Sequence, residues 1–251
     1  MSGFADPSFF GDHYAHEYDA RHPLDPTPAV DFLADLVPPG SRVLELAIGT
    51  GRVAIPLAAR GLAVEGVEGS AAMVEHLHAK PGGAAIPAAV GDMADAADAV
   101  KGPFPLAHLV YNTLFNLPTQ ERQLDCFRDV AQLLEPGGLF VIECYVQDVS
   151  EFDRGQRTQT RAISEDSVFL DVQLHDPVEQ AVTYQRITID ADGRTTLRPL
   201  RMRYCWPSEL DLMARLAGLR LRERHETWQR TPLTAASRNH VSVYEKPQAS
   251  A

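Results

Sequence analysis

Apolar residues occur in short runs over the first 145 positions of the chain, separated by segments with helical periodicity. Each run is aliphatic on both faces, which is typical of strands buried in a parallel sheet. The four predicted strands span residues 42–46, 63–67, 107–111 and 139–144. The predicted helices span residues 28–36, 53–60, 71–80 and 119–134. Alternation of strand and helix predicts βαβ units with right-handed crossovers, and therefore an α/β fold.

The pattern changes after the fourth run. Residues 146–166 are polar, contain Arg154, Arg157 and Arg161, and predict a mobile loop or lid. Alternation with period two follows in three stretches, which predicts an antiparallel meander inserted into the α/β domain. These stretches are residues 168–174, 182–184 and 200–204. Beyond them the pattern predicts one helix and two closing strands, at residues 207–216, 219–227 and 241–244.

Composition narrows the function classes. The 251 residues are 45% hydrophobic and 23% charged, an ordinary globular balance. Lys and Arg number 23 against 34 Asp and Glu, a net charge of −11 that repels phosphate backbones, so we expect no nucleic-acid partner. No run of 18 apolar residues exists, so we expect no membrane partner. Three isolated cysteines suit a reducing, cytoplasmic location.

Candidate chemistry begins at the end of the first predicted strand. Glu45 closes that strand, and a turn containing Gly49 and Gly51 lets the backbone pass close to a ligand. Seventeen residues beyond Gly51, the second strand ends in Glu68, a carboxylate placed to accept both hydroxyls of a ribose. These residues predict a nucleoside bound at a topological switch point.

Five segments in this order and spacing resemble the class I S-adenosylmethionine-dependent methyltransferases. They are Glu45–Gly51, Val67–Ser70, Gly91–Met93, Leu109–Asn112 and the turn Leu134–Gly138. Ala47 stands where the family often has a first glycine. The layout after residue 145 is similar to the small-molecule branch, which includes sugar N,N-dimethyltransferases and glycine/sarcosine-type enzymes.

The resemblance implies a Rossmann-like, seven-stranded, mostly parallel sheet with helices on both faces, plus the inserted antiparallel β-meander. It divides the chain into four parts. Residues 1–40 form an N-terminal helical or lid segment, and residues 41–145 form the core that binds S-adenosylmethionine. Residues 146–205 form an insertion that covers the substrate, and residues 206–251 complete the core sheet. The meander would supply substrate contacts or the interface of a homodimer.

The same resemblance assigns roles in binding S-adenosyl-L-methionine, with S-adenosyl-L-homocysteine as product. The turn with Ala47, Gly49 and Gly51 would run under the methionine part, and Glu45 would reach its ammonium. Glu68, followed by Gly69, would hold the ribose, while Asp92 and Met93 would meet the adenine. Tyr14 and Tyr18 would close over the cofactor carboxylate. Tyr111, Asn112 and Asn116 would lie where methyl group and acceptor meet.

The reaction is then predicted to be metal-independent methyl transfer to a nitrogen or oxygen of a small-molecule metabolite, and no metal ligands are expected. A hydroxyl acceptor would need a base, for which His13, His16 and Glu143 are candidates. Two alternatives stay open. One is a non-catalytic, cofactor-binding sensor or interaction protein. The other is an NAD(P)-dependent oxidoreductase, although Ala54 stands where a third glycine is expected.

Overall fold

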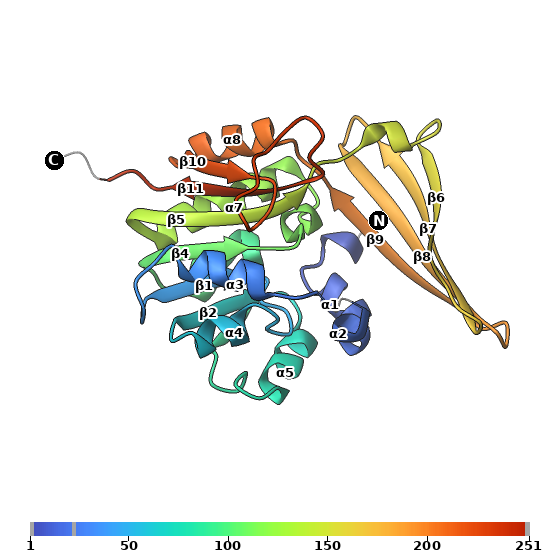
Figure 1. Ribbon diagram of the computed structural model, residues 1–251, viewed down its shortest axis with the longest axis horizontal. Helices are drawn as coiled ribbons and strands as arrows, with labels where there is room; N and C mark the ends of the chain where they lie inside the picture. Colours follow the sequence, from blue (N-terminus) through green and yellow to red (C-terminus); the bar gives the residue numbers. More distant parts are fainter. Residues whose placement is uncertain (1–2, 22–23, 249–251) are drawn as a thin grey trace.

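The computed structural model describes residues 3–21 and 24–248, which form two sheets (Figure 1). The larger has seven strands in the order β10-β11-β5-β4-β1-β2-β3, and the smaller has four in the order β6-β7-β8-β9. The strands of the large sheet are β1 (Arg42–Leu46), β2 (Ala63–Glu68), β3 (Ala88–Val90), β4 (Phe104–Leu109), β5 (Leu134–Tyr145), β10 (Arg220–His225) and β11 (Asn239–Glu245). The predicted fold class is confirmed.

Strand direction sets one edge of the large sheet apart. β11 runs antiparallel to both of its neighbours, β10 and β5, whereas the pairs among β1 to β5 are parallel. The carboxyl ends of five strands therefore meet at one edge. The chain moves outward from β1 in both directions, to β2 and β3 on one side and to β4 and β5 on the other. A crevice for a ligand is expected at such a switch point.

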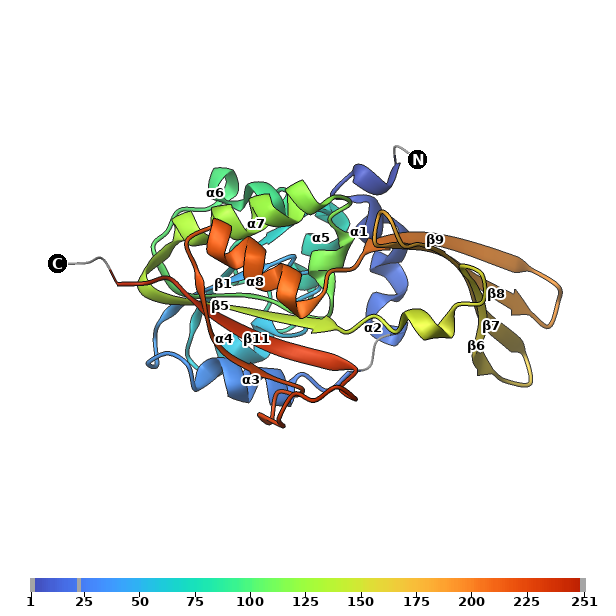
Figure 2. The same cartoon turned by 90° about the horizontal axis from the view of Figure 1, so that it is seen from above.

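Helices cover both faces of the large sheet (Figure 2). The helices are α1 (Phe9–Tyr14), α2 (Tyr18–Arg21), α3 (Thr27–Ala34), α4 (Ala54–Ala59), α5 (Ala71–Ala79), α6 (Ala96–Ala99), α7 (Gln120–Leu133) and α8 (Pro207–Leu216). One apolar cluster joins the sheet to α7 and α8, and a second joins it to α3 and α4. The sheet is thus buried on both faces, as its aliphatic strands require.

The small sheet is inserted between β5 and α8 and extends away from the core (Figure 1). Its strands are β6 (Gln156–Ile163), β7 (Ser167–Asp176), β8 (Ala181–Asp190) and β9 (Thr195–Arg203). The prediction of a loop across residues 146–166 is wrong for β6. This strand pairs along its length with β7, yet all its residues but Ala162 and Ile163 are polar, so no apolar alternation marks it.

Residues 3–21 cross the carboxyl edge of the large sheet and reach the small sheet (Figure 1). The Ser70 hydroxyl donates to Asp12 (2.9 Å), so it does not cap α5 as its position suggests. Asp19 accepts from the Thr50 hydroxyl (2.6 Å) and pairs with Lys80 (2.7 Å). These contacts hold the segment against the core.

Three further features bear on the predictions. The strand predicted over residues 107–111 is β4, and it ends at Leu109, because Tyr111 and Asn112 both adopt positive φ and turn the chain. In the described part of the chain no helix is long and apolar enough to cross a membrane. The cysteines Cys126, Cys144 and Cys205 are buried and unpaired.

Candidate active site

A cavity of about 840 Å³ lies where the carboxyl edge of the large sheet, the N-terminal segment and the small sheet meet. The core contributes Ala47, Gly49, Glu68, Gly69, Asp92, Met93, Tyr111, Asn112 and Asn116, and the N-terminal segment contributes Tyr18. The small sheet contributes what we call the inner face: Arg157, Gln159, Arg161, Asp171, Gln173, Tyr184, Arg186, Leu200 and Met202. Most of the cofactor residues predicted from the sequence thus surround one space.

The turn after β1 is shaped by left-handed backbone. Ala47 has φ 49° and Gly49 has φ 57°, and both line the cavity. Gly51 (φ 80°) has a different role from the one predicted. A Cβ at this position would lie 2.3 Å from Leu77 Cδ1, so Gly51 lets the turn pack against α5, and it does not line the cavity.

Glu68 ends β2 inside the cavity and is held by backbone donors. The Gly49 N–H donates to its Oε2 (2.8 Å) and the Ser70 N–H donates to its Oε1 (3.0 Å). The residue is 8% exposed, and burial raises the pKa of its carboxyl against these two hydrogen bonds. A fixed carboxylate with further lone pairs can accept hydroxyl groups from a ligand.

Glu45 lies behind the turn and lines a small pocket next to the cavity, together with Tyr18 and Arg52. Burial raises the pKa of Glu45 to about 8, although Arg52 opposes the shift. Its Oε2 has no hydrogen-bond partner in the described part of the chain. The neighbouring His108, at 3.9 Å, stays neutral because burial lowers its pKa to about 3. The Glu45 carboxyl also accepts a backbone hydrogen bond from Ala54. A buried carboxyl with one oxygen left unpartnered suits a ligand ammonium.

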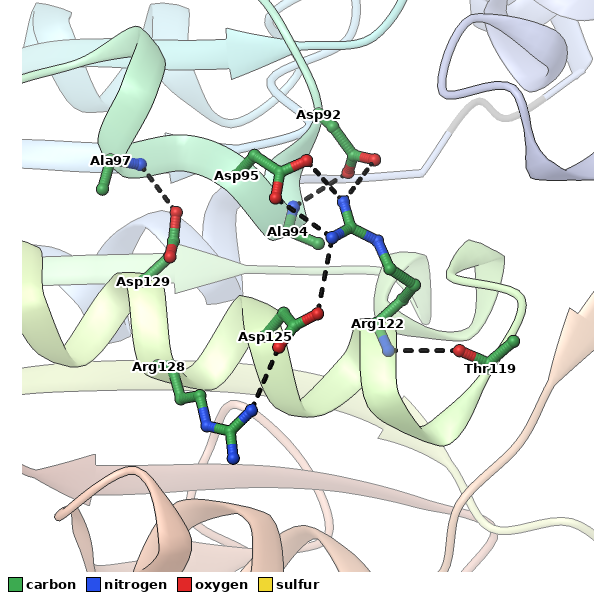
Figure 3. Close-up of polar contacts among 9 residues, drawn as sticks. All are labelled: Asp92, Ala94, Asp95, Ala97, Thr119, Arg122, Asp125, Arg128 and Asp129. Carbon is green, nitrogen blue, oxygen red and sulfur yellow. Dashed lines mark hydrogen bonds and ion pairs between the residues drawn. The ribbon is translucent and has the colours of Figure 1, made fainter.

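Asp92 is fixed from two sides (Figure 3). Its Oδ1 accepts from the Ala94 N–H (2.9 Å), and its Oδ2 accepts from Arg122 Nη2 (2.9 Å). Arg122, in the first turn of α7, also binds Asp95 (2.6 Å), so one guanidinium joins the helix to the segment after β3. This anchoring leaves Asp92 oriented at the cavity wall beside Met93.

Glu143 does not line the cavity, although the sequence made it a candidate for catalysis. Its Oε2 accepts from the Tyr111 N–H (2.8 Å) and its backbone oxygen accepts from the Asn112 N–H (3.0 Å). The Asn112 Oδ1 in turn accepts from the Tyr145 N–H (2.5 Å). Glu143 therefore fixes the left-handed turn that carries Tyr111 and Asn112 into the cavity.

The two candidate histidines lie outside the cavity. His13 and His16 are exposed; His13 Nδ1 contacts the Phe9 carbonyl oxygen (2.7 Å), and His16 packs edge-on against His76. Tyr14 does not line the cavity either; its ring stacks on Phe10, and the ring centroid lies 5.6 Å from the guanidinium carbon of Arg186. The described cavity wall contains no histidine.

The sequence did not point to several residues that line the cavity. Arg122 lies on the amphipathic helix α7 and Tyr184 on β8, and Tyr145 is the last residue of β5. Burial raises the pKa of the Tyr145 and Tyr184 phenols, so both stay protonated at neutral pH. Asp171 and Gln173 alternate with the apolar residues of β7, and that alternation was the signal that could have identified a polar inner face.

Known proteins resemble this chain in sequence and structure. A family model described as a methyltransferase domain matches residues 43–138. The CcbJ methyltransferase from Streptomyces caelestis is 39% identical, with a TM-score of 0.89 over 96% of this chain and 99% of that chain. The cypemycin N-terminal methyltransferase of a Streptomyces species is 29% identical over 212 residues, which are 82% of this chain and 84% of that protein.

A more distant structure supports the fold alone. An amino pentose methyltransferase from Micromonospora echinaspora, solved with S-adenosylmethionine bound, is 19% identical, with a TM-score of 0.71. The match covers 93% of this chain and 96% of that one. The likeness therefore extends through the small sheet as well as the core.

Proposed function

Because this chain belongs to the class I S-adenosylmethionine-dependent methyltransferases, we propose that it methylates a nitrogen atom of a small molecule without a metal ion. Membership makes the chain an enzyme with S-adenosylmethionine as methyl donor, and it excludes the oxidoreductase and the non-catalytic sensor. The observation that carries the choice of nitrogen is the absence of histidine from the described cavity wall.

The residues present fit the cofactor. Glu68 offers a fixed carboxylate for the ribose, and Asp92, held by Arg122, offers an acceptor for the adenine amino group beside Met93. The Glu45 Oε2, which has no partner in the described chain, suits the ammonium of the methionine part, which would run over Ala47 and Gly49. Tyr18 lines both the cavity and the small pocket and Tyr14 lines neither, which supports Tyr18 as the tyrosine that closes over the cofactor carboxylate.

The bound cofactor supplies a methyl group on a sulfonium, which is transferred in line to a nucleophile. The residues around the transfer point exclude water and orient the acceptor rather than remove a proton. Tyr111, Asn112 and Asn116 line this part of the cavity, and the Asn116 Oδ1 is buried without a partner in the described chain. It can accept a hydrogen bond from an amine N–H.

An oxygen acceptor of high pKa would need a base at this point. The phenols of Tyr18, Tyr145 and Tyr184 cannot serve at neutral pH, because burial raises the pKa of each, for Tyr18 to about 12. An amine that arrives neutral needs no base. No group of three or more His, Cys, Asp or Glu that could hold a metal occurs among the described residues.

Release of S-adenosylhomocysteine with matched acceptors tests the proposal. Primary and secondary amines should be methylated with rates that rise as the pH approaches the amine pKa. The corresponding alcohols should give no product above background. Methylation of an alcohol at a comparable rate would contradict the nitrogen acceptor. The homodimer and the absence of a nucleic-acid partner stay predictions of the sequence.

A further inference from the structure

The inner face of the small sheet carries an unusual set of charges for this acidic chain. Strand register places Gln159, Asp171, Arg186 and Arg198 side by side in one row across the four strands. The next row is Arg157, Gln173, Tyr184 and Leu200. With Arg161, these rows hold four arginines and one aspartate, a formal charge of +3 in a chain of net charge −11.

Some of this charge is compensated by the N-terminal segment and the linker before β6. Arg198 pairs with Glu17, and Arg157 pairs with Glu151. The guanidinium groups of Arg161 and Arg186 then remain, and they share one carboxylate, that of Asp171. Asp171 lies 3.7 Å from Arg161 and 3.8 Å from Arg186, so the three groups together keep one positive charge.

The geometry of this triad directs the arginines toward the cavity. Asp171 is buried, with only 4% of its side chain exposed, whereas Arg161 is 49% and Arg186 is 23% exposed. The closest contact of each arginine with Asp171 is through Nε. The terminal Nη groups, which form the fork that binds oxyanions, lie farther from the carboxylate. Asp171 is thus an ion-pair partner of both arginines at longer than hydrogen-bond distance, and its Oδ1 and the Arg186 Nε are buried without a hydrogen-bond partner in the described chain.

A third arginine adds to the field. Arg201 lines the cavity, and its recorded hydrogen bond in the described chain is to the carbonyl oxygen of Pro118 (3.4 Å), not to a carboxylate. A local cluster of one sign of charge attracts ligands of the opposite sign, even in a protein whose total charge is opposite. The described cavity wall as a whole carries six arginines and six carboxylates, so the excess positive charge is local to the triad and to Arg201.

We propose that Arg161 and Arg186, which share the single carboxylate of Asp171 as ion-pair partner, bind an oxyanion carried by the methyl acceptor, either a carboxylate or a phosphate. The proposal rests on the proposed function, since the same cavity must hold the amine. The acceptor would then be an amine with an anionic group, held at one end by the inner face and presented at the other to the methyl group.

Binding without turnover gives the first test. Protein saturated with S-adenosylhomocysteine is titrated with sodium phosphate or sodium malonate against sodium chloride at equal ionic strength. The wild type should show a saturable rise in Tm, and Arg161→Gln/Arg186→Gln should lose it. The control Arg154→Gln/Arg194→Gln removes the same charge from exposed positions outside the cavity and should respond like the wild type.

An equal rise in all three proteins, or no rise in the wild type with either anion, would overturn the subsite. The stronger response of the two anions separates a carboxylate from a phosphate ligand. If the double variant does not fold, as judged by circular dichroism, the single Arg161→Gln replaces it. The Arg161 side chain is half exposed, so its replacement should leave the fold intact. Loss of the anion-dependent rise in Tm in this single variant then supports the subsite, and an unchanged rise contradicts it.

Turnover gives the second test and separates the two proposals. Amines are offered as carboxylate and carboxamide pairs: glycine and glycinamide, proline and prolinamide, 4-aminobenzoate and 4-aminobenzamide. The wild type should prefer the carboxylates by at least tenfold in kcat/KM, and Arg161→Gln/Arg186→Gln should lose that preference. Turnover without preference refutes the subsite alone. No turnover of any amine counts against the nitrogen acceptor, and the anion titration then decides the subsite.

Discussion

Glu143 and Trp228 lie 85 residues apart in the chain and are joined by a hydrogen bond from the indole Nε1 to the carboxylate Oε1 (2.8 Å). The other oxygen of Glu143 accepts from the Tyr111 backbone, so one carboxylate ties β5 to the turn after β4 and to the loop before β11. The side chain that the sequence offered for catalysis is thus a positioning residue.

Replacement of Glu143 should loosen that turn. Glu143→Ala leaves the Tyr111 N–H and the Trp228 indole without their acceptor, which we expect to lower the free energy of unfolding by about 2 kcal/mol. Glu143→Gln keeps only one carbonyl oxygen, so it can accept from only one of the two donors. Its free energy of unfolding should lie between those of the wild type and Glu143→Ala. Urea unfolding measures both, with exposed Glu165→Gln as the control. An equal free energy of unfolding in Glu143→Ala and the wild type would show that the hydrogen bonds of Glu143 contribute nothing to stability.

Glu68 should dominate the affinity for the nucleoside. Glu68→Ala removes a fixed carboxylate from two hydroxyls, so binding of S-adenosylhomocysteine should weaken more than tenfold, about 1.4 kcal/mol or more. Isothermal titration gives the value. Glu65→Ala is the control, because Glu65 is on the same strand but pairs with Arg42 outside the cavity. Equal affinity in Glu68→Ala would mean that the ribose lies elsewhere.

Arg122 should act on adenine recognition through Asp92. Arg122→Met frees the Asp92 carboxylate, so we expect several-fold weaker binding of S-adenosylhomocysteine and a smaller preference for it over S-inosylhomocysteine. Arg128→Met is the matched control, since Arg128 is on the same helix and binds only Asp125 in the network drawn (Figure 3). If Arg122→Met keeps the wild-type preference for S-adenosylhomocysteine over S-inosylhomocysteine, Asp92 does not contact the adenine as proposed.

Glu45 should make the stability of the ligand-free protein depend on pH. Its pKa is raised to about 8 in the fold, above the ordinary value near 4.5, so the folded state holds the proton more tightly. The stability from this group is present below pH 4.5 and is lost as the pH rises through about 8. Glu45→Gln cannot titrate. The Tm difference between wild type and Glu45→Gln should therefore fall from pH 5 to pH 9, and a constant difference would contradict the raised pKa.

The exposed histidines should not take part in proton transfer. His13→Ala and His16→Ala remove imidazoles that lie outside the cavity, so kcat should change by less than about twofold at any pH. Methyl transfer rates with the best amine acceptor measure this. A tenfold loss of kcat with unchanged cofactor affinity would restore one of them as a base.

The sequence alone determined the core of this protein, because local patterns there coincide with the tertiary environment. Val43, Leu44 and Leu46 of β1 are apolar on both faces of the sheet because helices cover both faces. The glycine turn after β1 and Glu68 at the end of β2 lie together because the carboxyl ends of these parallel strands meet at one edge. The order of the motifs was enough to identify the family and the cofactor.

Only the tertiary structure decided which polar side chains share the cavity. β6 has almost no apolar positions, because one side faces a polar cavity and the residues of the other side are exposed, so its sequence predicts a loop. The positions of Gly51 and Glu143 in the chain predict contact with a ligand, but Gly51 packs close to Leu77 and Glu143 binds Trp228. Such pairings join segments that are far apart in the sequence, and no local periodicity records them.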